Sequence, residues 1–369
     1  MRIKRLSYCD KKTGWCVRDI DFMRLTLLVG ASGVGKTKIL RSLLTLVNIS
    51  KGRSMNGVEW SLSFELGDDS YIWEGAFAVQ DDESLDFMHY NELSIPIEYE
   101  SLSKNGSKII ERTSDSLKLN GQPTVKLEAD KSAISLLKEE EVVSPVFFAL
   151  NKIYMPITEN RGIIRVTPIL SDKDAPINDI KSIKKIHFLS PIDKLFLLYK
   201  KKFPEFEIIK QKFIEIFPLV TDIDFTIGNS FNKMSYPILR IHEVNVDKWI
   251  MQTEMSSGMY RTLSQLVTMV LAEEGDVILI DEFENSLGVN CIEEVAELVL
   301  HPEADIQFVL TSHHPYIINN IDFNRWKIVV RDGSMVSVHS ASDLKIGTHS
   351  KHDAFMQLIQ TSAYKTGKL

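Results

Sequence analysis

The sequence predicts an α/β protein with a mixed, mostly parallel sheet, an antiparallel β subdomain and a helical insertion. A short apolar run, RLTLLV at 24–29, is followed by a Gly-rich turn and then by KTKILRSLLTLV, whose apolar residues recur at helical spacing. Near the C-terminal end, the apolar runs VILI, QFVLTS and KIVVR alternate with helical or loop segments. This alternation is typical of a mostly parallel sheet.

Three parts are predicted along the chain. Residues 1–130 open with a strand-like MRIKRLSYCD and continue into turn-bounded segments, in which two Asn-Gly pairs favour tight hairpins because both residue types tolerate positive φ. Residues 131–235 form a helical insertion with the runs SAISLLKEE, DKLFLLYKKKF and FEIIKQKFIEIF. Residues 236–369 return to strand-like segments, followed by an amphipathic helix from about Met259 to Glu273 and the parallel apolar runs.

Composition narrows the class of protein. The 369 residues carry 43 basic and 50 acidic side chains, a net charge of -7, so nonspecific binding of a polyanion by the whole chain is excluded and any nucleic-acid contact must be local. No apolar leader is present, and no stretch approaches the roughly 20 apolar residues of a membrane span. We therefore expect a cytoplasmic protein with no membrane role of its own. Cys9, Cys16 and Cys291 lack disulfide-framework spacing and are interpreted as small buried residues.

The strongest motif is GASGVGKT at residues 30–37, a complete G-x-x-x-x-G-K-[ST] loop between a predicted strand and a predicted helix. Its glycines allow backbone N–H groups to turn inward around an anion, and the following helix N-terminus adds partial positive charge. The lysine reaches phosphate oxygens and the threonine hydroxyl binds Mg²⁺. The residues predicted to contact ATP are Gly30, Ser32, Gly33, Gly35, Lys36 and Thr37.

An acidic pair, Asp281-Glu282, follows the apolar run VILI. A carboxylate at the C-terminal tip of a buried strand can hold a metal ion, and its neighbour can orient or deprotonate an attacking water. Taken alone, the acidic pair would suit a solvated loop. The phosphate-binding motif at residues 30–37 favours the catalytic interpretation.

Two further segments carry possible chemistry. The run QFVLTS leads into a histidine pair, and His313 could donate a hydrogen bond to the γ-phosphate. By itself the pair also suits a plain loop. Ser256, Ser257 and Gly258 stand directly before the amphipathic helix, where unsatisfied N–H groups form a second anion site. A simple helix N-cap is the alternative for the serines.

The four motifs in this order resemble the ABC-type ATPase heads of the SMC, RecF and OLD group. MSSGMYR at 255–261 resembles the LSGGQ signature, DEFENSLG at 281–288 resembles the Walker B and D-loop pattern DEPExxLHP, and TSHHP resembles the TSHSP switch. The resemblance implies a P-loop NTPase of the ABC-ATPase type that uses ATP and Mg²⁺. It also implies that Lys36 and Thr37 contact phosphate and Mg²⁺, Asp281 supports Mg²⁺, Glu282 is the catalytic base and His313 is the switch.

The chain departs from the family pattern at several positions. Phe283 replaces the usual Pro, Gly288 stands where His or Asp is frequent, and Met255 replaces Leu in the signature. These changes leave the detail of the D-loop and the strength of the signature contact open. Gln80 is the candidate for the Q-loop glutamine.

The resemblance further implies a head-to-tail homodimer or higher homo-oligomer, in which Ser256–Gly258 of one chain closes over the ATP held by the other. The chain resembles compact defence ATPases of the PtuA, AriA and OLD-like type, which implies control of a separate effector nuclease in bacterial anti-phage defence or DNA maintenance. Only about 55 residues follow His313 and they contain no DxD cluster, so nuclease activity within the chain is not expected. The alternatives are a slowly hydrolysing assembly scaffold and a transporter ATPase, the latter disfavoured by the long insertion.

The insertion contains a lysine-rich segment that could follow a phosphate backbone. A solvated helical face with interleaved acidic residues is the alternative. The lysines are Lys181, Lys184, Lys185, Lys194, Lys200, Lys201, Lys202, Lys210 and Lys212.

Overall fold

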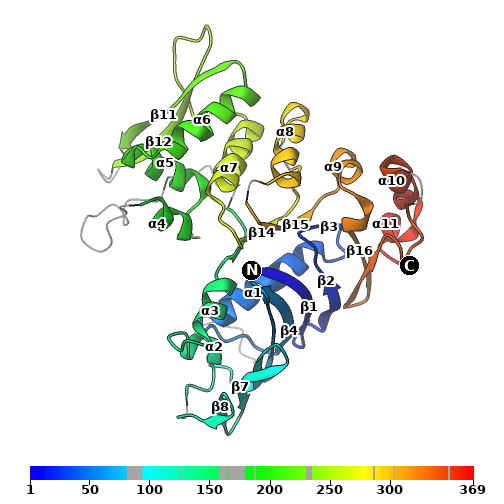
Figure 1. The fold of residues 1–369 in the computed structure, drawn as a ribbon. Coiled ribbons are helices and arrows are strands. Elements are labelled where there is room, and N and C mark those ends of the chain that lie inside the picture. Colours follow the sequence, from blue (N-terminus) through cyan, green and yellow to red (C-terminus); the bar gives the residue numbers. More distant parts are fainter. Residues whose placement is uncertain are drawn as a thin grey trace. The chain divides into compact units, whose positions relative to one another are not determined.

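The computed structural model of the chain describes residues 1–80, 94–125, 127–157, 164, 179–186, 188–229, 235–285, 287–302, 304–347 and 350–369. The described chain divides into two compact units. Figure 1 colours the chain by residue number, so each unit can be found from its residue ranges. Unit 1 comprises Met1–Met155, Gly275–Phe283 and Ile306–Leu369, and unit 2 comprises Pro156–Glu274 and Glu284–Asp305. The division into 1–130, 131–235 and 236–369 that the sequence suggests stays a prediction.

Unit 1 contains a sheet of 14 strands in the order β10-β14-β15-β3-β16-β17-β2-β1-β4-β5-β6-β7-β8-β9. Its strands, in chain order, are β1 Arg2–Asp10, β2 Trp15–Asp21, β3 Leu25–Val29, β4 Val58–Leu66, β5 Asp69–Phe77, β6 Ile97–Lys104, β7 Ser107–Thr113, β8 Leu117–Leu119, β9 Gln122–Pro123, β10 Ile153–Tyr154, β14 Val277–Ile280, β15 Gln307–Thr311, β16 Trp326–Asp332 and β17 Met335–Ser340.

The sheet is parallel where the apolar runs of the sequence predict it. β10, β14, β15, β3 and β16 pair with one another in parallel, in that order. Every residue of β3, β14 and β15 is buried, as expected for parallel strands that are covered on both faces. The predicted α/β class with a mixed sheet is therefore confirmed.

β17 pairs antiparallel with β16 and parallel with β2. Beyond it in the sheet, β2, β1 and β4 to β9 form the predicted antiparallel subdomain. β1 pairs with β2 and β4, and β4 to β9 continue as a meander. The two Asn-Gly pairs lie at hairpin turns with positive φ at both residues: Asn105 (50°) and Gly106 (81°), and Asn120 (50°) and Gly121 (75°). These dihedrals explain why the sequence signal was specific, since type I′ turns require φ > 0 at both central positions.

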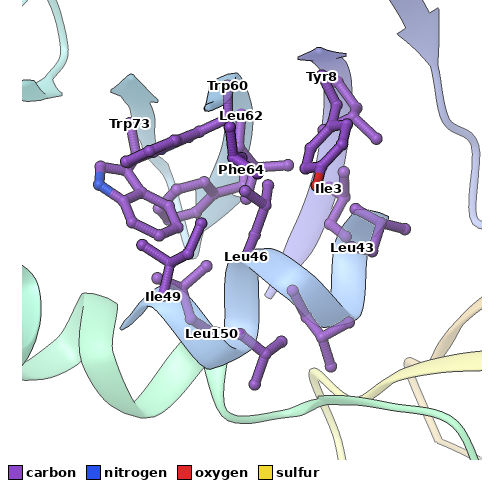
Figure 2. Packing of buried hydrophobic residues seen from close by; sticks show 14 of the residues in the cluster. Ile3, Tyr8, Leu43, Leu46, Ile49, Trp60, Leu62, Phe64, Trp73 and Leu150 are labelled. Carbon is purple, nitrogen blue, oxygen red and sulfur yellow. The ribbon is translucent and has the colours of Figure 1, made fainter. Parts of the chain in front are cut away.

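The core of unit 1 lies between this sheet and helix α1, Lys36–Ser50. Figure 2 shows Leu43, Leu46 and Ile49 of α1 facing aromatic and aliphatic side chains of β1, β4 and β5. Trp60 and Trp73 meet there edge to face, with ring centroids 5.2 Å apart. This packing holds the helix that follows the P-loop against the sheet. The other helices of unit 1 are α2 Ala133–Leu136, α3 Ser144–Leu150, α9 Pro315–Asn320, η1 Phe323–Arg325, α10 Lys351–Gln360 and α11 Ser362–Thr366.

Unit 2 combines helices with a small three-stranded antiparallel sheet of order β11-β12-β13. The strand β11 was not predicted, although Ile223, Phe225 and Ile227 in its sequence VTDIDFTIGN alternate with polar residues as in a half-buried strand. The elements are α4 Ile180–Lys185, α5 Pro191–Lys201, α6 Pro204–Ile216, β11 Val220–Asn229, β12 Ser235–Glu243, β13 Ile250–Met251, α7 Ser257–Leu271 and α8 Val289–Leu300. Across the described parts of both units, no helix combines the length and apolarity needed to cross a membrane.

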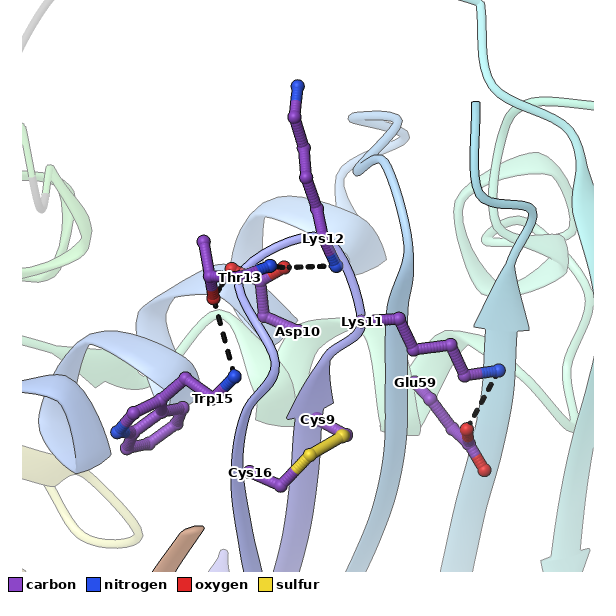
Figure 3. The surroundings of a disulfide bond; sticks show 8 residues. All are labelled: Cys9, Asp10, Lys11, Lys12, Thr13, Trp15, Cys16 and Glu59. Carbon is purple, nitrogen blue, oxygen red and sulfur yellow. Dashed lines mark hydrogen bonds and ion pairs between the residues drawn. A yellow bond between two sulfur atoms is a disulfide. The ribbon is translucent and has the colours of Figure 1, made fainter. Parts of the chain in front are cut away.

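The structure corrects the expectation that no cysteine forms a disulfide, although Cys16 is buried as predicted and Cys9 is half-buried. Cys9 on β1 and Cys16 on β2 are register partners and are joined by a disulfide (Figure 3). Antiparallel pairing places them opposite each other with Cα atoms 4.1 Å apart, a proximity that a spacing of seven residues does not reveal. Cys291 is free and buried, as predicted.

Candidate nucleotide-binding site

The predicted phosphate loop runs from the end of β3 to the start of α1. Gly30, Gly33 and Gly35 all have positive φ, at 147°, 81° and 109°, conformations that glycine adopts without steric cost. A Cβ at Gly30 would lie 2.5 Å from the carbonyl oxygen of Val329, whereas a Cβ at Gly33 would meet nothing within 4 Å. The first glycine is thus required by close backbone packing, and Gly33 lies in open space on the exposed side of the loop.

Lys36 and Thr37 are the first two residues of α1. The helix is preceded by Gly35, and no side chain caps it, so the N–H groups of its first turn point toward the loop as an anion site would require. The Lys36 side chain is buried, and its Nζ donates to the carbonyl oxygens of Gly30 and Ala31, each at 2.9 Å. This ammonium group therefore already lies inside the curve of the loop.

The acidic pair lies at the end of the next strand but one. β14 ends at Ile280, and Asp281 and Glu282 follow it directly. Since β14, β15 and β3 are neighbouring parallel strands, their carboxyl ends, with the acidic pair, His313 and the phosphate loop, share one edge of the sheet. Ligands of open α/β sheets bind at this edge.

Glu282 has a backbone conformation that few side chains adopt. Its φ is 45°, in the left-handed region, where a non-glycine residue stores strain and is held in place by its surroundings. Its N–H donates to Thr311 Oγ1 at 2.7 Å, and the same hydroxyl donates to Asp281 Oδ1 at 2.6 Å. Thr311 was not among the predicted site residues. In the sequence it stands at the end of a buried strand and is the first residue of TSHHP, the segment that resembles the switch, but no role was predicted for it.

The two histidines after β15 have different surroundings. His314 is the N-cap of α9: its Nδ1 accepts the N–H of Tyr316 at 3.2 Å, and its own N–H donates to Ser312 Oγ at 3.0 Å. His313 is half-buried and precedes that cap. His314 thus has a structural role, and the contact of His313 with the γ-phosphate stays a prediction.

The oxygen donors at this edge suit magnesium. Mg²⁺ prefers one or two protein oxygen ligands together with substrate phosphates and water, and Asp281 and Thr37 are donors of that kind. Among the described residues, no group of three or more His, Cys, Asp and Glu side chains could hold a metal by itself. Nucleotide phosphates and water would complete the coordination of a magnesium ion held by these two oxygens.

The signature segment belongs to unit 2. Ser256 is the N-cap of α7, and its Oγ accepts the N–H of Met259 at 3.1 Å. Ser256 and Ser257 are exposed, and Gly258 is half-buried in the first turn. Ser256 thus acts as the simple N-cap weighed from the sequence, and the exposed end of the helix is also available to an anion.

Two more residues bear on the predicted site. Gln80, just beyond β5, is exposed, and its backbone exchanges hydrogen bonds with the Asn56 side chain. Arg331 on β16, which the sequence did not indicate, donates from its guanidinium to the carbonyl oxygen of Gly33 at 3.3 Å. These two residues are 298 positions apart in the chain, so no local pattern could have connected them.

The lysines of the insertion are not equivalent. Lys194 is buried and donates to the carbonyl oxygen of Lys184, and Lys210 forms ion pairs with Asp222 and Glu207. The consecutive Lys200, Lys201 and Lys202 are all exposed at the C-terminal end of α5. Only part of the segment therefore presents its charge to solvent.

A phosphate loop between β3 and α1, with an acidic pair on a neighbouring parallel strand, defines an AAA ATPase head of the ABC/SMC type. Residues 25–319 match the family described as "AAA domain, putative AbiEii toxin, Type IV TA system". The chain belongs to this family. No curated protein matches it.

Solved structures of SMC heads are similar to this chain. One is an Smc head bound to the C-winged helix domain of ScpA, with a TM-score of 0.53 and 14% identity over 94% of this chain and 100% of that one. The Thermotoga maritima SMC head gives 0.42 and 13%, over 92% and 99%. An Smc head with an extended coiled coil, bound to the C-terminal domain of ScpA derived from Pyrococcus furiosus, gives 0.42 and 16%, over 93% and 97%. At such identities the first likeness shows the fold alone.

Proposed function

We propose that this chain binds ATP with Mg²⁺ at residues 30–37 and hydrolyses it. One observation carries the proposal: the glycine loop with buried Lys36 and the Asp281-Glu282 pair emerge at the same edge of three neighbouring parallel strands. Phosphoryl transfer needs little covalent chemistry from a protein and depends on positioning and charge stabilisation. These groups supply both.

Each residue has a distinct role in this proposal. The backbone N–H groups of the loop and the Lys36 ammonium bind the β- and γ-phosphates, and Thr37 and Asp281 hold the metal, which neutralises phosphate charge when bound. Glu282 orients the attacking water and accepts its proton. His313 donates a hydrogen bond to the γ-phosphate and so registers its presence.

The site is completed by a second copy of the chain in this proposal. The exposed Ser256 and Ser257, with Gly258, present the N-terminus of α7 to the ATP of the partner, so a two-fold, head-to-tail dimer holds two nucleotides. The exposure of Ser256 and Ser257 at the N-terminus of α7 supports this role, because both residues are open to solvent.

The biological role we propose is control of a separate effector nuclease, in cytoplasmic anti-phage defence or DNA maintenance. The family description names a putative toxin of a Type IV toxin–antitoxin system, and a system of two components supports a role beside a separate protein. ATP binding without turnover would instead favour an assembly scaffold that locks in the nucleotide-bound state.

The first test is steady-state ATP hydrolysis by the wild type, Lys36→Ala and Glu282→Gln, each with and without double-stranded DNA. We expect Glu282→Gln to lower kcat by about 100- to 10,000-fold, the usual contribution of a general base. Lys36→Ala should abolish ATP binding. The exposed variants Lys118→Ala and Glu98→Gln, on β8 and β6, are the matched controls and should behave as wild type. Hydrolysis that survives both site variants would refute the proposal.

DNA binding by the insertion is tested separately. Reversing the charge of Lys200, Lys201 and Lys202 should weaken DNA binding and reduce the slope of log affinity against log salt by about one for each phosphate that the variant no longer neutralises. The same reversal at the exposed Lys118 should leave binding unchanged. An identical salt dependence in the triple variant and the wild type would remove this cluster from the proposal.

A further inference from the structure

Thr311, the last residue of β15, is hydrogen-bonded to three successive residues of the acidic motif. Its hydroxyl donates to Asp281 Oδ1 at 2.6 Å and accepts the N–H of Glu282 at 2.7 Å. Its carbonyl oxygen accepts the N–H of Phe283 at 2.9 Å. A single residue thus contacts the carboxylate at 281 and fixes the backbone of the two residues that follow.

The surroundings of Thr311 restrict these contacts to one arrangement. The side chain is 1% exposed, on a strand that lies between β14 and β3. A hydroxyl has one proton, so the bond that it donates to the carboxylate leaves its lone pairs to accept the N–H of Glu282. Because the donor faces an ionised acceptor, the bond is of the stronger, charge-assisted kind.

The backbone of Glu282 requires such an anchor. With φ at 45°, this residue is in a conformation that persists only when neighbouring groups over-determine it. The N–H groups of Glu282 and Phe283 both donate hydrogen bonds to Thr311. The second bond exists because residue 283 is Phe: a proline, usual at this position in the resembling family, has no N–H to donate.

We propose that Thr311 is a positioning residue for ATP hydrolysis, which directs the Asp281 carboxylate toward Mg²⁺ and sets the backbone from which the Glu282 side chain reaches the attacking water. The inference rests on the function proposed above and extends it to a residue outside the phosphate loop, the acidic pair and the histidine. Hydrogen-bond partners of metal ligands orient those ligands, and their loss commonly lowers metal affinity or activity about 10- to 100-fold.

The test compares Thr311→Val, which keeps the shape and loses the hydroxyl, with Thr311→Ser, which keeps the hydroxyl. The control is Thr26→Val on the adjacent β3. Thr26 is also fully buried, its hydroxyl accepts the N–H of Met23 at 2.9 Å, and its register partner is Val309 on β15. Affinity for a nonhydrolysable ATP analogue is measured by calorimetry with Mg²⁺ and with EDTA, beside kcat and the unfolding temperature of each full-length variant.

We expect Thr311→Val to lose the Mg²⁺-dependent part of analogue affinity and about 10- to 100-fold in kcat, while its affinity in EDTA stays that of the wild type. Thr311→Ser should restore both quantities, and Thr26→Val should lower only the unfolding temperature. Wild-type Mg²⁺ dependence or turnover in Thr311→Val, or an equal loss in Thr26→Val, would overturn the inference while leaving the proposed ATPase intact. Absence of Mg²⁺-dependent binding in the wild type would overturn the proposed function and this inference with it.

Discussion

At the scale of single residues, close backbone contacts decide which positions of the site tolerate change. Gly30 combines a φ of 147° with a carbonyl oxygen 2.5 Å from the place of a Cβ. Gly67 also has a positive φ, 59°, but lies in open space. Substitution of Gly67 therefore tests the effect of backbone conformation alone, and substitution of Gly30 adds the effect of steric overlap.

We predict that Gly30→Ala destabilises the protein by about 1–3 kcal/mol, as overpacking of a close contact does, and that it weakens ATP binding because the loop must move away from Val329. Gly67→Ala should lower stability by less and leave ATP binding unchanged. Urea unfolding and calorimetric titration with ATP measure the two effects. Equal behaviour of the two variants would show that the contact with Val329 does not shape the loop.

Glu100 is a buried carboxylate in the antiparallel subdomain. It accepts hydrogen bonds from Trp73 Nε1 at 2.9 Å and from the N–H of Ala133 at 2.6 Å, and the buried Arg112 guanidinium lies 3.9 Å away. Burial raises the pKa of this carboxyl above its ordinary value of 4.5, against the opposing effect of these partners and Ser132. The folded state therefore favours the protonated form more than the unfolded chain does.

We predict that Glu100→Gln lowers the free energy of unfolding by about 1–3 kcal/mol, because both carboxyl oxygens of Glu100 accept hydrogen bonds and the NH2 group of Gln would face one of these donors. Since the folded-state pKa is raised, the stability that Glu100 adds is fully present below pH 4.5 and decreases as the pH rises through the folded-state value. The difference in unfolding free energy between the wild type and Glu100→Gln, from urea denaturation at a series of pH values, should decrease accordingly. The exposed Glu98→Gln is the control, and a difference that grows with pH would contradict the sign.

At the scale of elements, the sequence located helix α5 better than it located strand β11. Helix α5 begins with a capping box, in which Ser190 Oγ accepts the N–H of Asp193 and the Asp193 carboxylate accepts the N–H of Ser190. This local signal, with Pro191 at the first position, is readable without any tertiary contact. β11 has no such boundary signal, and its pairing with β12 gives it its structure.

We predict that Ser190→Ala destabilises unit 2 by about 1 kcal/mol, the usual cost of removing an N-cap. Ser190→Thr keeps the hydroxyl and should cost less. Thermal unfolding followed by far-ultraviolet circular dichroism measures both variants. If Ser190→Ala and the wild type unfold at the same temperature, the capping box contributes nothing to the stability of α5.

At the scale of the whole molecule, the proposed head-to-tail dimer makes assembly depend on bound nucleotide. A catalytic-base variant should bind ATP without releasing it through hydrolysis, so the nucleotide-bound dimer should accumulate. We predict that Glu282→Gln with ATP and Mg²⁺ elutes at twice the chain mass of 42.1 kDa in size-exclusion chromatography with light scattering. The double variant Lys36→Ala/Glu282→Gln should stay monomeric, and so should Glu282→Gln in EDTA. A monomer under all three conditions would contradict the head-to-tail dimer.

The sequence by itself determined the α/β class, the antiparallel hairpins, α1, the buried strands β14 and β15, and the candidate phosphate loop and acidic pair. These features are local, because apolar periodicity, Asn-Gly turns and contiguous motifs depend on residues that are close together in the sequence. The family resemblance added the roles of those residues.

Only the tertiary structure decided which strands are neighbours, and with them the contacts of Thr311 with Asp281 and Glu282 and of Arg331 with Gly33. It also paired Cys9 with Cys16 and buried Lys194 within a segment that reads as a solvated basic run. Strand order and side-chain partners depend on packing between segments that are distant in the chain. Local periodicity fixes which face of an element is apolar, but it does not specify which element covers that face.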